Sequence, residues 1–76
     1  MKKLVEVLAK NLVDNPDQVQ VDEIETERSI VLEVRVAPGD MGKVIGKQGR
    51  VAKAIRTVVK AAAAGTGKRV NVEFLP

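Results

Sequence analysis

The sequence predicts a two-layer α+β domain in which three helices cover one face of a three-stranded sheet. The chain has 76 residues, which suits one small domain spanning residues 1–76. Hydrophobic residues make up 45% of it, enough for a packed core. Their spacing switches between the helical period and the alternation of strands, in the order helix, strand, strand, helix, helix, strand (αββααβ). Such an order is expected to place all helices on one side of the sheet.

The first half of the chain predicts one helix and two strands. Hydrophobic residues recur at helical spacing between residues 4 and 13, and Asn15-Pro16 is expected to stop this helix. Alternation around Val21 predicts a strand, and its slip at Glu23-Ile24 predicts a bulge or an early end there. Residues 30–36 alternate most clearly and predict the second strand.

The second half predicts two helices and a last strand. Asp40 is the expected N-cap of a short helix that runs to about Ile45. Gly46-Lys47-Gln48-Gly49 interrupts it, and a longer helix is expected from about Arg50 to Ala64. Glycines at 65 and 67 then close the helix, and alternation at residues 69–74 predicts the third strand.

The charge is distributed very unevenly along the chain. Residues 1–40 contain five bases and nine acids, a net charge of −4, whereas residues 41–76 contain eight bases and one acid, a net charge of +7. Such asymmetry is typical of a chain that presents a basic surface to a polyanion, although a solvated charged surface is the alternative. On a helical wheel, Arg50, Lys53, Arg56 and Lys60 share one arc, and aliphatic residues fill the rest.

The glycine loop at residues 46–49 has the features that a phosphate requires. Two glycines three residues apart allow close approach of a ligand to the backbone, and the amides at the start of the following helix attract anions. Lys47 and Arg50 add positive charge. The alternative is that these glycines form only a tight turn between two helices.

Other classes of function fit the sequence poorly. Gly42 and Gly46 have three residues between them, whereas a P-loop needs four, and Gln48 stands where it needs Ser or Thr. The chain has no His, Cys or Tyr, so we expect no enzyme, no metal site and no cofactor. Its one aromatic residue, Phe74, is expected in the core, which argues against the aromatic base stacking of RRM and OB folds.

The loop and its flanks resemble a known family. Val44-Ile45-Gly46-Lys47-Gln48-Gly49-Arg50 is similar to the I-G-x-x-G signature of KH domains, and the element order resembles the type II, largely bacterial, form of that fold. The similarity extends through Asp40–Lys43, Ala52–Ala62 and Arg69–Val72, where the chain resembles small stand-alone bacterial KH proteins of the KhpA type. The one departure is Gly39, where an acidic residue is more usual.

The resemblance implies single-stranded RNA as the partner, held by the loop and by an aliphatic groove that includes part of strand Ile30–Val36. It also implies self-association or pairing with a larger Jag-type KH protein (KhpB/EloR), and post-transcriptional regulation linked to cell growth and division. For Val44, Ile45, Val51 and Ile55, core packing and groove lining both remain open, and Lys60, Lys68 and Arg69 are expected at the periphery. The expected RNA-binding residues are Lys43, Val44, Ile45, Gly46, Lys47, Gln48, Gly49, Arg50, Ala52, Lys53, Ile55 and Arg56.

Two alternatives stay open at this point. A KH fold can serve as a protein-interaction or dimerisation module without binding nucleic acid, and single-stranded DNA could replace RNA because phosphate contacts do not sense the sugar. The sequence contains neither a membrane-spanning apolar run nor the apolar core of a signal peptide, so we expect a cytoplasmic protein.

Overall fold

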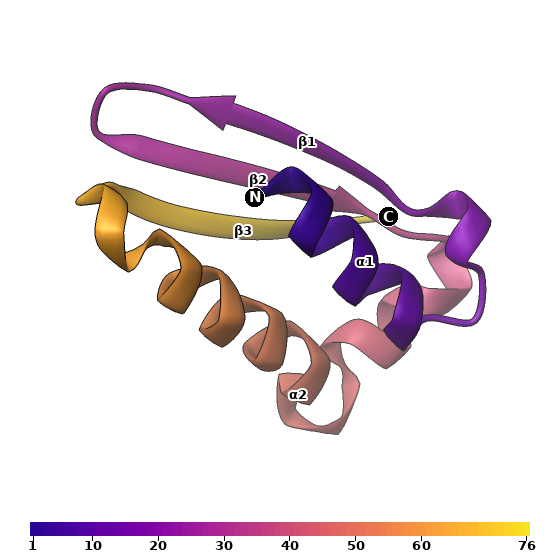
Figure 1. Ribbon diagram of the computed structural model, residues 1–76. Helices are drawn as coiled ribbons and strands as arrows, with labels where there is room; N and C mark the ends of the chain where they lie inside the picture. Colours follow the sequence, from indigo (N-terminus) through magenta and orange to yellow (C-terminus); the bar gives the residue numbers. More distant parts are fainter.

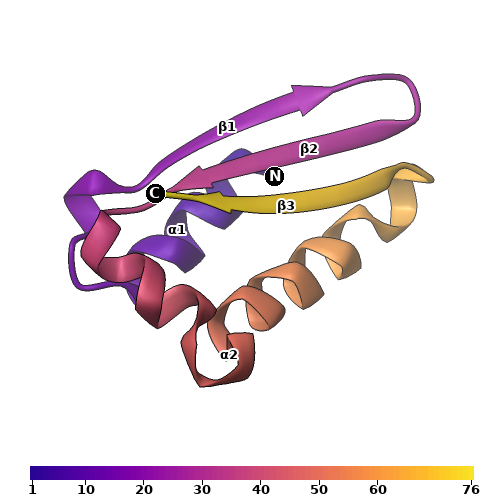
Figure 2. The same ribbon diagram turned by 180° about the vertical axis from the view of Figure 1, so that it is seen from behind.

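A computed structural model gives the architecture of the chain and describes residues 1–46 and 49–76. Helix α1 (Lys2–Leu12) is followed by the 3₁₀ turn η1 (Pro16–Gln18), strand β1 (Gln20–Glu25) and strand β2 (Ser29–Arg35). Helix α2 (Pro38–Ala63), the 3₁₀ turn η2 (Ala64–Thr66) and strand β3 (Arg69–Leu75) complete the chain. Figures 1 and 2 show α1 and α2 packed on the same face of the sheet, which leaves the opposite face open.

Helix α2 contains a break that divides it into two segments. Gly49 has a φ of +70°, far from the value near −63° that an α-helix requires, and few residues other than glycine adopt it. Figures 1 and 2 show α2 changing direction partway along its length. With α1 and the two segments of α2, the predicted order αββααβ and the two-layer α+β fold are confirmed.

The sheet has the order β1-β2-β3, with β2 in the centre. β1 and β2 are antiparallel, with Val21 opposite Val34, and β2 and β3 are parallel, with Leu32 opposite Val72. Alternate residues of β2 point beneath the helices and are buried, as the strand pattern predicted. The core between the layers contains Val5, Ala9, Val19, Val21, Ile30, Leu32, Val34, Val36, Val44, Ala52, Ile55, Val59 and Val72.

The bulge or early end predicted at Glu23-Ile24 is wrong. β1 pairs with β2 without interruption as far as Glu25, which lies opposite Ile30. Glu23 and Glu25 take positions on the helix-facing side, where they find cationic partners. Glu23 lies 3.9 Å from the N-terminal amine and also accepts a hydrogen bond from the Lys2 backbone amide at 3.1 Å, and Glu25 pairs with Lys68. Because these partners satisfy the carboxylates, β1 stays paired with β2 although its helix-facing positions are no longer hydrophobic.

The prediction that Asp40 caps the second helix is also wrong. α2 begins two residues earlier, at Pro38, whose missing amide hydrogen suits the first helical position. Asp40 is 1% exposed, and its carboxylate reaches back to the turn after α1. It accepts hydrogen bonds from the amide of Asp14 at 3.2 Å and from the amide and side chain of Asn15 at 3.0 and 3.2 Å. Asp40 therefore ties the end of α1 to the start of α2.

The open face of the sheet carries a row of acidic residues. Asp22 lies opposite Glu33 in the β1–β2 pair, and Glu33 lies opposite Glu73 in the β2–β3 pair. Like charges that face each other across strands destabilise a sheet. The same face exposes Ile24, beside its neighbour Val31. This face is unsuited to a polyanion, because it would repel phosphate groups.

Within the described part of the chain, none of the helices combines the length and the hydrophobicity needed to cross a lipid bilayer.

Asp40→Asn should destabilise the protein in a pH-dependent way. Burial acts to raise the pKa of Asp40, but the hydrogen bonds from Asn15 and Asp14 and the charge of Lys43 outweigh it, so that the pKa is lowered. Charged Asp40 therefore stabilises the fold above its unfolded-state pKa of about 3.9, and this contribution is lost as the pH falls through the lower folded-state pKa. Urea unfolding gives the free energy of unfolding of the parent and of Asp40→Asn. The difference between the two proteins should be smaller at about pH 2.5 than at about pH 7.

Asp17→Asn is the matched control, because Asp17 is exposed in η1. A gap for Asp40→Asn that is equally large at both ends of the pH range would contradict a role for the charge.

Glu33→Gln should stabilise the fold, because it removes the central charge of the acidic row. Each cross-strand pair contributes roughly 0.2–1 kcal/mol, so we expect the free energy of unfolding to rise by about that amount per pair relieved. Thermal unfolding at low salt should show the gain, and 1 M salt, where the Debye length is about 3 Å, should reduce it. A variant no more stable than the parent at low salt would contradict this account.

Candidate nucleic-acid interface

The segment of α2 after Gly49 separates apolar from basic residues. Ala52, Ile55, Val59 and Ala63 are buried and face the sheet. The same segment exposes basic side chains on its outer side, as the helical wheel predicted: Arg50, Lys53, Arg56 and Lys60. A single helix thus enters the core on one side and offers positive charge to solvent on the other.

The glycine corner that precedes this segment is accessible. Gly46 and Gly49 are half-buried, and among the described residues no atom beyond the adjacent residues and the nearby helix backbone lies within 4 Å of a Cβ built on Gly42, Gly46 or Gly49. The glycine at 42 is therefore not required for packing against the rest of the described chain. The backbone at this corner is open to close approach by a ligand. Lys47 and Gln48, which were predicted to contact phosphate, lie outside the described residues.

The structure divides the predicted site residues into an exposed and a buried group. Lys43, Ile45, Arg50, Lys53 and Arg56 are exposed beside the corner or along the helix that follows it. Three predicted residues are in the core instead, with exposed fractions of 5% or less: Val44, Ala52 and Ile55. Their burial resolves the alternative left open for Val44 and Ile55 in favour of core packing. They support the site from beneath and do not line its surface.

Two of the exposed bases already have partners within the protein. Lys43 forms an ion pair with Asp14 at 2.6 Å, at the turn that Asp40 holds. Arg56 donates to the carbonyl oxygen of Val72 through Nε at 3.4 Å and Nη2 at 3.3 Å. Its guanidinium also lies 5.4 Å from the centroid of the Phe74 ring, a cation–π contact. Arg56 therefore joins α2 to β3, and Phe74 is partly buried against the core, as expected.

The groove beside the basic helix is formed by β3, which corrects the expectation that strand Ile30–Val36 lines it. β2 is the central strand, and Ile30, Leu32 and Val34 are buried beneath the helices. The pocket that follows α2 has a volume of about 320 Å³. Its walls are formed by Arg56, Val59, Lys60, Val70, Asn71, Val72 and Glu73.

Sequence reasoning placed Lys60 at the periphery and did not consider Asn71. Lys60 lies four residues after Arg56 on the same helix face, a spacing visible in the sequence. Asn71 required knowledge of the strand order, because only that order places β3 beside α2.

Among residues 1–46 and 49–76, no group of three or more His, Cys, Asp or Glu side chains is arranged to hold a metal ion. The chemical features of the interface are positive charge, open backbone and a half-apolar groove.

Comparison with known proteins gives the family of the chain. Residues 2–74 match the family model described as KhpA/KhpB, KH domain. The chain is 67% identical to a Clostridium acetobutylicum protein and 64% identical to one from Clostridium perfringens, and each match covers 99% of this chain and all of the relative. It is 55% identical to a protein of Aquifex aeolicus, over 99% of this chain and 95% of the relative. All three relatives bear the name RNA-binding protein KhpA.

No solved structure matches the chain. The family model spans nearly all of the sequence, and the Clostridium acetobutylicum relative aligns with 99% of this chain. The chain therefore belongs to the KhpA/KhpB family of KH domains.

Proposed function

We propose that this protein binds short single-stranded RNA, with the sugar–phosphate backbone at the Gly46–Gly49 corner and the bases in the groove between α2 and β3. One observation carries the proposal: the open glycine corner leads directly into a helix whose outer face is basic and whose side borders a groove. The relatives named as RNA-binding proteins support it.

The charges near the groove fit a polyanion. Arg50 and Lys53 follow the corner on the exposed side of α2, and Lys60 reaches the groove wall. Single strands suit this surface better than duplexes, because unpaired bases can turn into a groove while the backbone stays on the charged rim. The acidic row on the open sheet face disfavours binding there.

The groove has few features that would discriminate strongly among bases. Val59, Val70 and Val72 offer aliphatic contacts, whereas the side chains of Asn71 and Glu73, at the alternate positions of β3, lie on the open face of the sheet. Without aromatic stacking, we expect weak binding to about four nucleotides, the number that a GXXG loop clamps.

A second site would raise this affinity through avidity. Self-association, or pairing with a larger Jag-type KH protein, would supply one, and both stay predictions from the family resemblance. The same holds for post-transcriptional regulation linked to cell growth and division.

Lys47→Asp combined with Gln48→Asp should weaken RNA binding by about tenfold or more, because two negative charges would repel the backbone at the corner. Fluorescence anisotropy with a labelled single-stranded RNA measures the loss, and circular dichroism checks the fold. The matched control is Lys3→Asp with Gln18→Asp, which makes the same charge change at exposed positions of α1 and η1.

Equal binding by the loop variant and its parent would contradict the proposal. It would favour the alternative of a KH-fold protein-interaction or dimerisation module. A DNA oligomer of the same sequence, measured alongside, tests whether a 2′-hydroxyl contact distinguishes RNA from DNA.

The salt dependence of binding should be shallow. Each phosphate contact on a single strand contributes roughly 0.7 to the slope of log affinity against log salt, so a short site should give a slope of magnitude about 1–3. Anisotropy titrations at several salt concentrations give this slope. A magnitude above about 5 would instead indicate diffuse binding by all the bases of the second half.

A further inference from the structure

Arg56 lies where α2 meets the free edge of β3. β3 pairs with the central strand β2 on one side only. The amide of Arg69 and the carbonyl oxygen of Leu75 form hydrogen bonds with the residues that flank β2, at 2.9 and 3.0 Å. In a parallel pair, the residues at the alternate positions turn their amide and carbonyl groups the other way. Val72 therefore presents its carbonyl group at the free edge, beside α2.

The guanidinium of Arg56 is held at this edge by two kinds of contact. Its Nε and Nη2 atoms both donate to the carbonyl oxygen of Val72, at 3.4 and 3.3 Å. Its central carbon lies 5.4 Å from the centroid of the Phe74 ring. Ordering a long side chain costs conformational entropy, which weakens binding when the ligand has to impose the order. These contacts position Arg56 before any ligand arrives.

One edge of the guanidinium remains unused. The group carries five N–H donors in a fixed plane. Nε and one hydrogen of Nη2 are taken by Val72, which leaves the second hydrogen of Nη2 and both hydrogens of Nη1. Within residues 1–46 and 49–76, Arg56 forms no ion pair that would occupy them. Nη1 and Nη2 therefore offer a parallel pair of donors, a fork that can bind two neighbouring acceptors at once.

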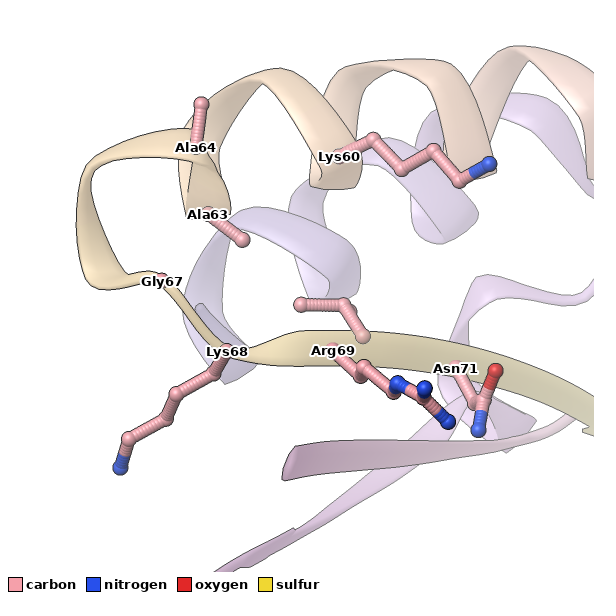
Figure 3. A pocket seen from close by; sticks show the side chains of 8 residues that line it. Lys60, Ala63, Ala64, Gly67, Lys68, Arg69 and Asn71 are labelled. Atoms are coloured by element: carbon pink, nitrogen blue, oxygen red, sulfur yellow. The ribbon is translucent and has the colours of Figure 1, made fainter. Parts of the chain in front are cut away.

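Arg56 is part of the wall of the groove between α2 and β3. The rest of the helical wall is formed by Val59 and Lys60. Lys60 follows Arg56 by four residues and so lies on the same face of the helix. Figure 3 shows the Lys60 side chain extending along α2, away from the Ala63–Ala64 end of the helix. A nucleotide in the groove would meet an aliphatic wall, the fork of Arg56 and, for its phosphate, the charge of Lys60.

Only some bases present two neighbouring acceptors to such a fork. Cytosine carries N3 and O2 side by side, and guanine carries O6 and N7. In adenine and uracil, each acceptor on the Watson–Crick and Hoogsteen edges stands next to an N–H donor, which would face a guanidinium N–H and repel it. Both edges of a base are accessible in a single strand. The fork can therefore discriminate between these two pairs of bases.

We propose that Arg56 selects the base that enters the groove, favouring cytosine or guanine over uracil and adenine at one position of the RNA. Its Nη1–Nη2 edge donates both hydrogen bonds to the base, while Nε stays bonded to Val72 and the Phe74 ring supports the guanidinium. The inference rests on the proposed function, and it names a specificity-determining residue within that site.

Tetranucleotides of cytidine and of uridine give the sharpest comparison, because the two bases have the same size and differ only at position 4 and in the proton on N3. In fluorescence anisotropy at neutral pH, the parent should bind the cytidine oligomer about five- to tenfold more tightly, the lower end of what a bidentate contact gives. Arg56→Lys keeps the charge but lacks the fork. It should bind both oligomers equally, about as tightly as the parent binds the uridine oligomer.

Arg50→Lys is the matched control, because Arg50 is exposed on the same segment of α2 and does not line the groove. It should keep the preference for cytidine. Arg56 also joins α2 to β3, so circular dichroism and thermal unfolding check the fold of each variant. Any loss of folded protein would lower both affinities by the same factor, so the ratio of the two affinities reports base selection alone.

A uridine tetranucleotide with one guanosine tests the second base. If guanine uses the fork, this oligomer should gain affinity over the uridine oligomer on the parent and on Arg50→Lys, but not on Arg56→Lys. Replacing the guanosine with 7-deazaguanosine removes N7 and should abolish that gain. A preference for either base that depends on Arg56 supports the inference, and this oligomer shows which of the two bases the groove accepts.

Three results would overturn the inference while leaving the proposed function intact. The parent could bind all the tetranucleotides equally, or Arg56→Lys could keep the preference of the parent. Arg56→Lys could also weaken the cytidine and uridine oligomers by the same factor while remaining folded, which would make Arg56 a phosphate contact. Failure of the parent to bind any of the oligomers would refute the proposed function, and the inference with it.

Discussion

The packing of α2 on the sheet is the contact on which the rest of the structure depends. Ile55 and Val59 are 1% and 0% exposed and join Leu32 and Val34 in the core. Because a helix has only one face to bury, this packing fixes the direction of the opposite, basic face. The same packing sets the helix beside β3 and so creates the groove. Burying side chains of this size contributes about 1.5–3 kcal/mol each, far more than any exposed ion pair.

Electrostatics then assign different roles to the two sides of the domain. The acidic row on the open face and the basic face of α2 give opposite potentials, which orient an approaching polyanion. Acids of the first half also pair with selected bases of the second. Lys43 meets Asp14 near the glycine corner, and Lys68 meets Glu25 near the start of β3. The hydrogen bond from Lys68, and then its charge, hold the pKa of Glu25 below the ordinary value. Between these two ends Arg56 is held by β3, whereas Arg50, Lys53 and Lys60 form no ion pair among the described residues.

Periodicity and turn residues were enough to predict the element order, the fold class and the exposed basic arc, because these depend on local spacing. Features set by partners distant in sequence were not predictable. Asp40 follows helix-capping rules locally, but its partner Asn15 lies 25 residues away. Glu23 and Glu25 keep β1 regular only because the N-terminus and Lys68 come to meet them. The family resemblance implied a groove along strand Ile30–Val36, whereas the pocket beside α2 is bordered by β3.

Backbone amide chemical shifts recorded during titration with a short single-stranded RNA test the central claim most directly. Binding along α2 should move the signals of Gly49, Arg50 and Lys53 together with those of Lys60 and Asn71, and should leave Ile24 and Glu33 on the open face unchanged. Shifts confined to the open face, or no shifts at saturating RNA, would show that the glycine corner and the basic helix do not form a nucleic-acid interface.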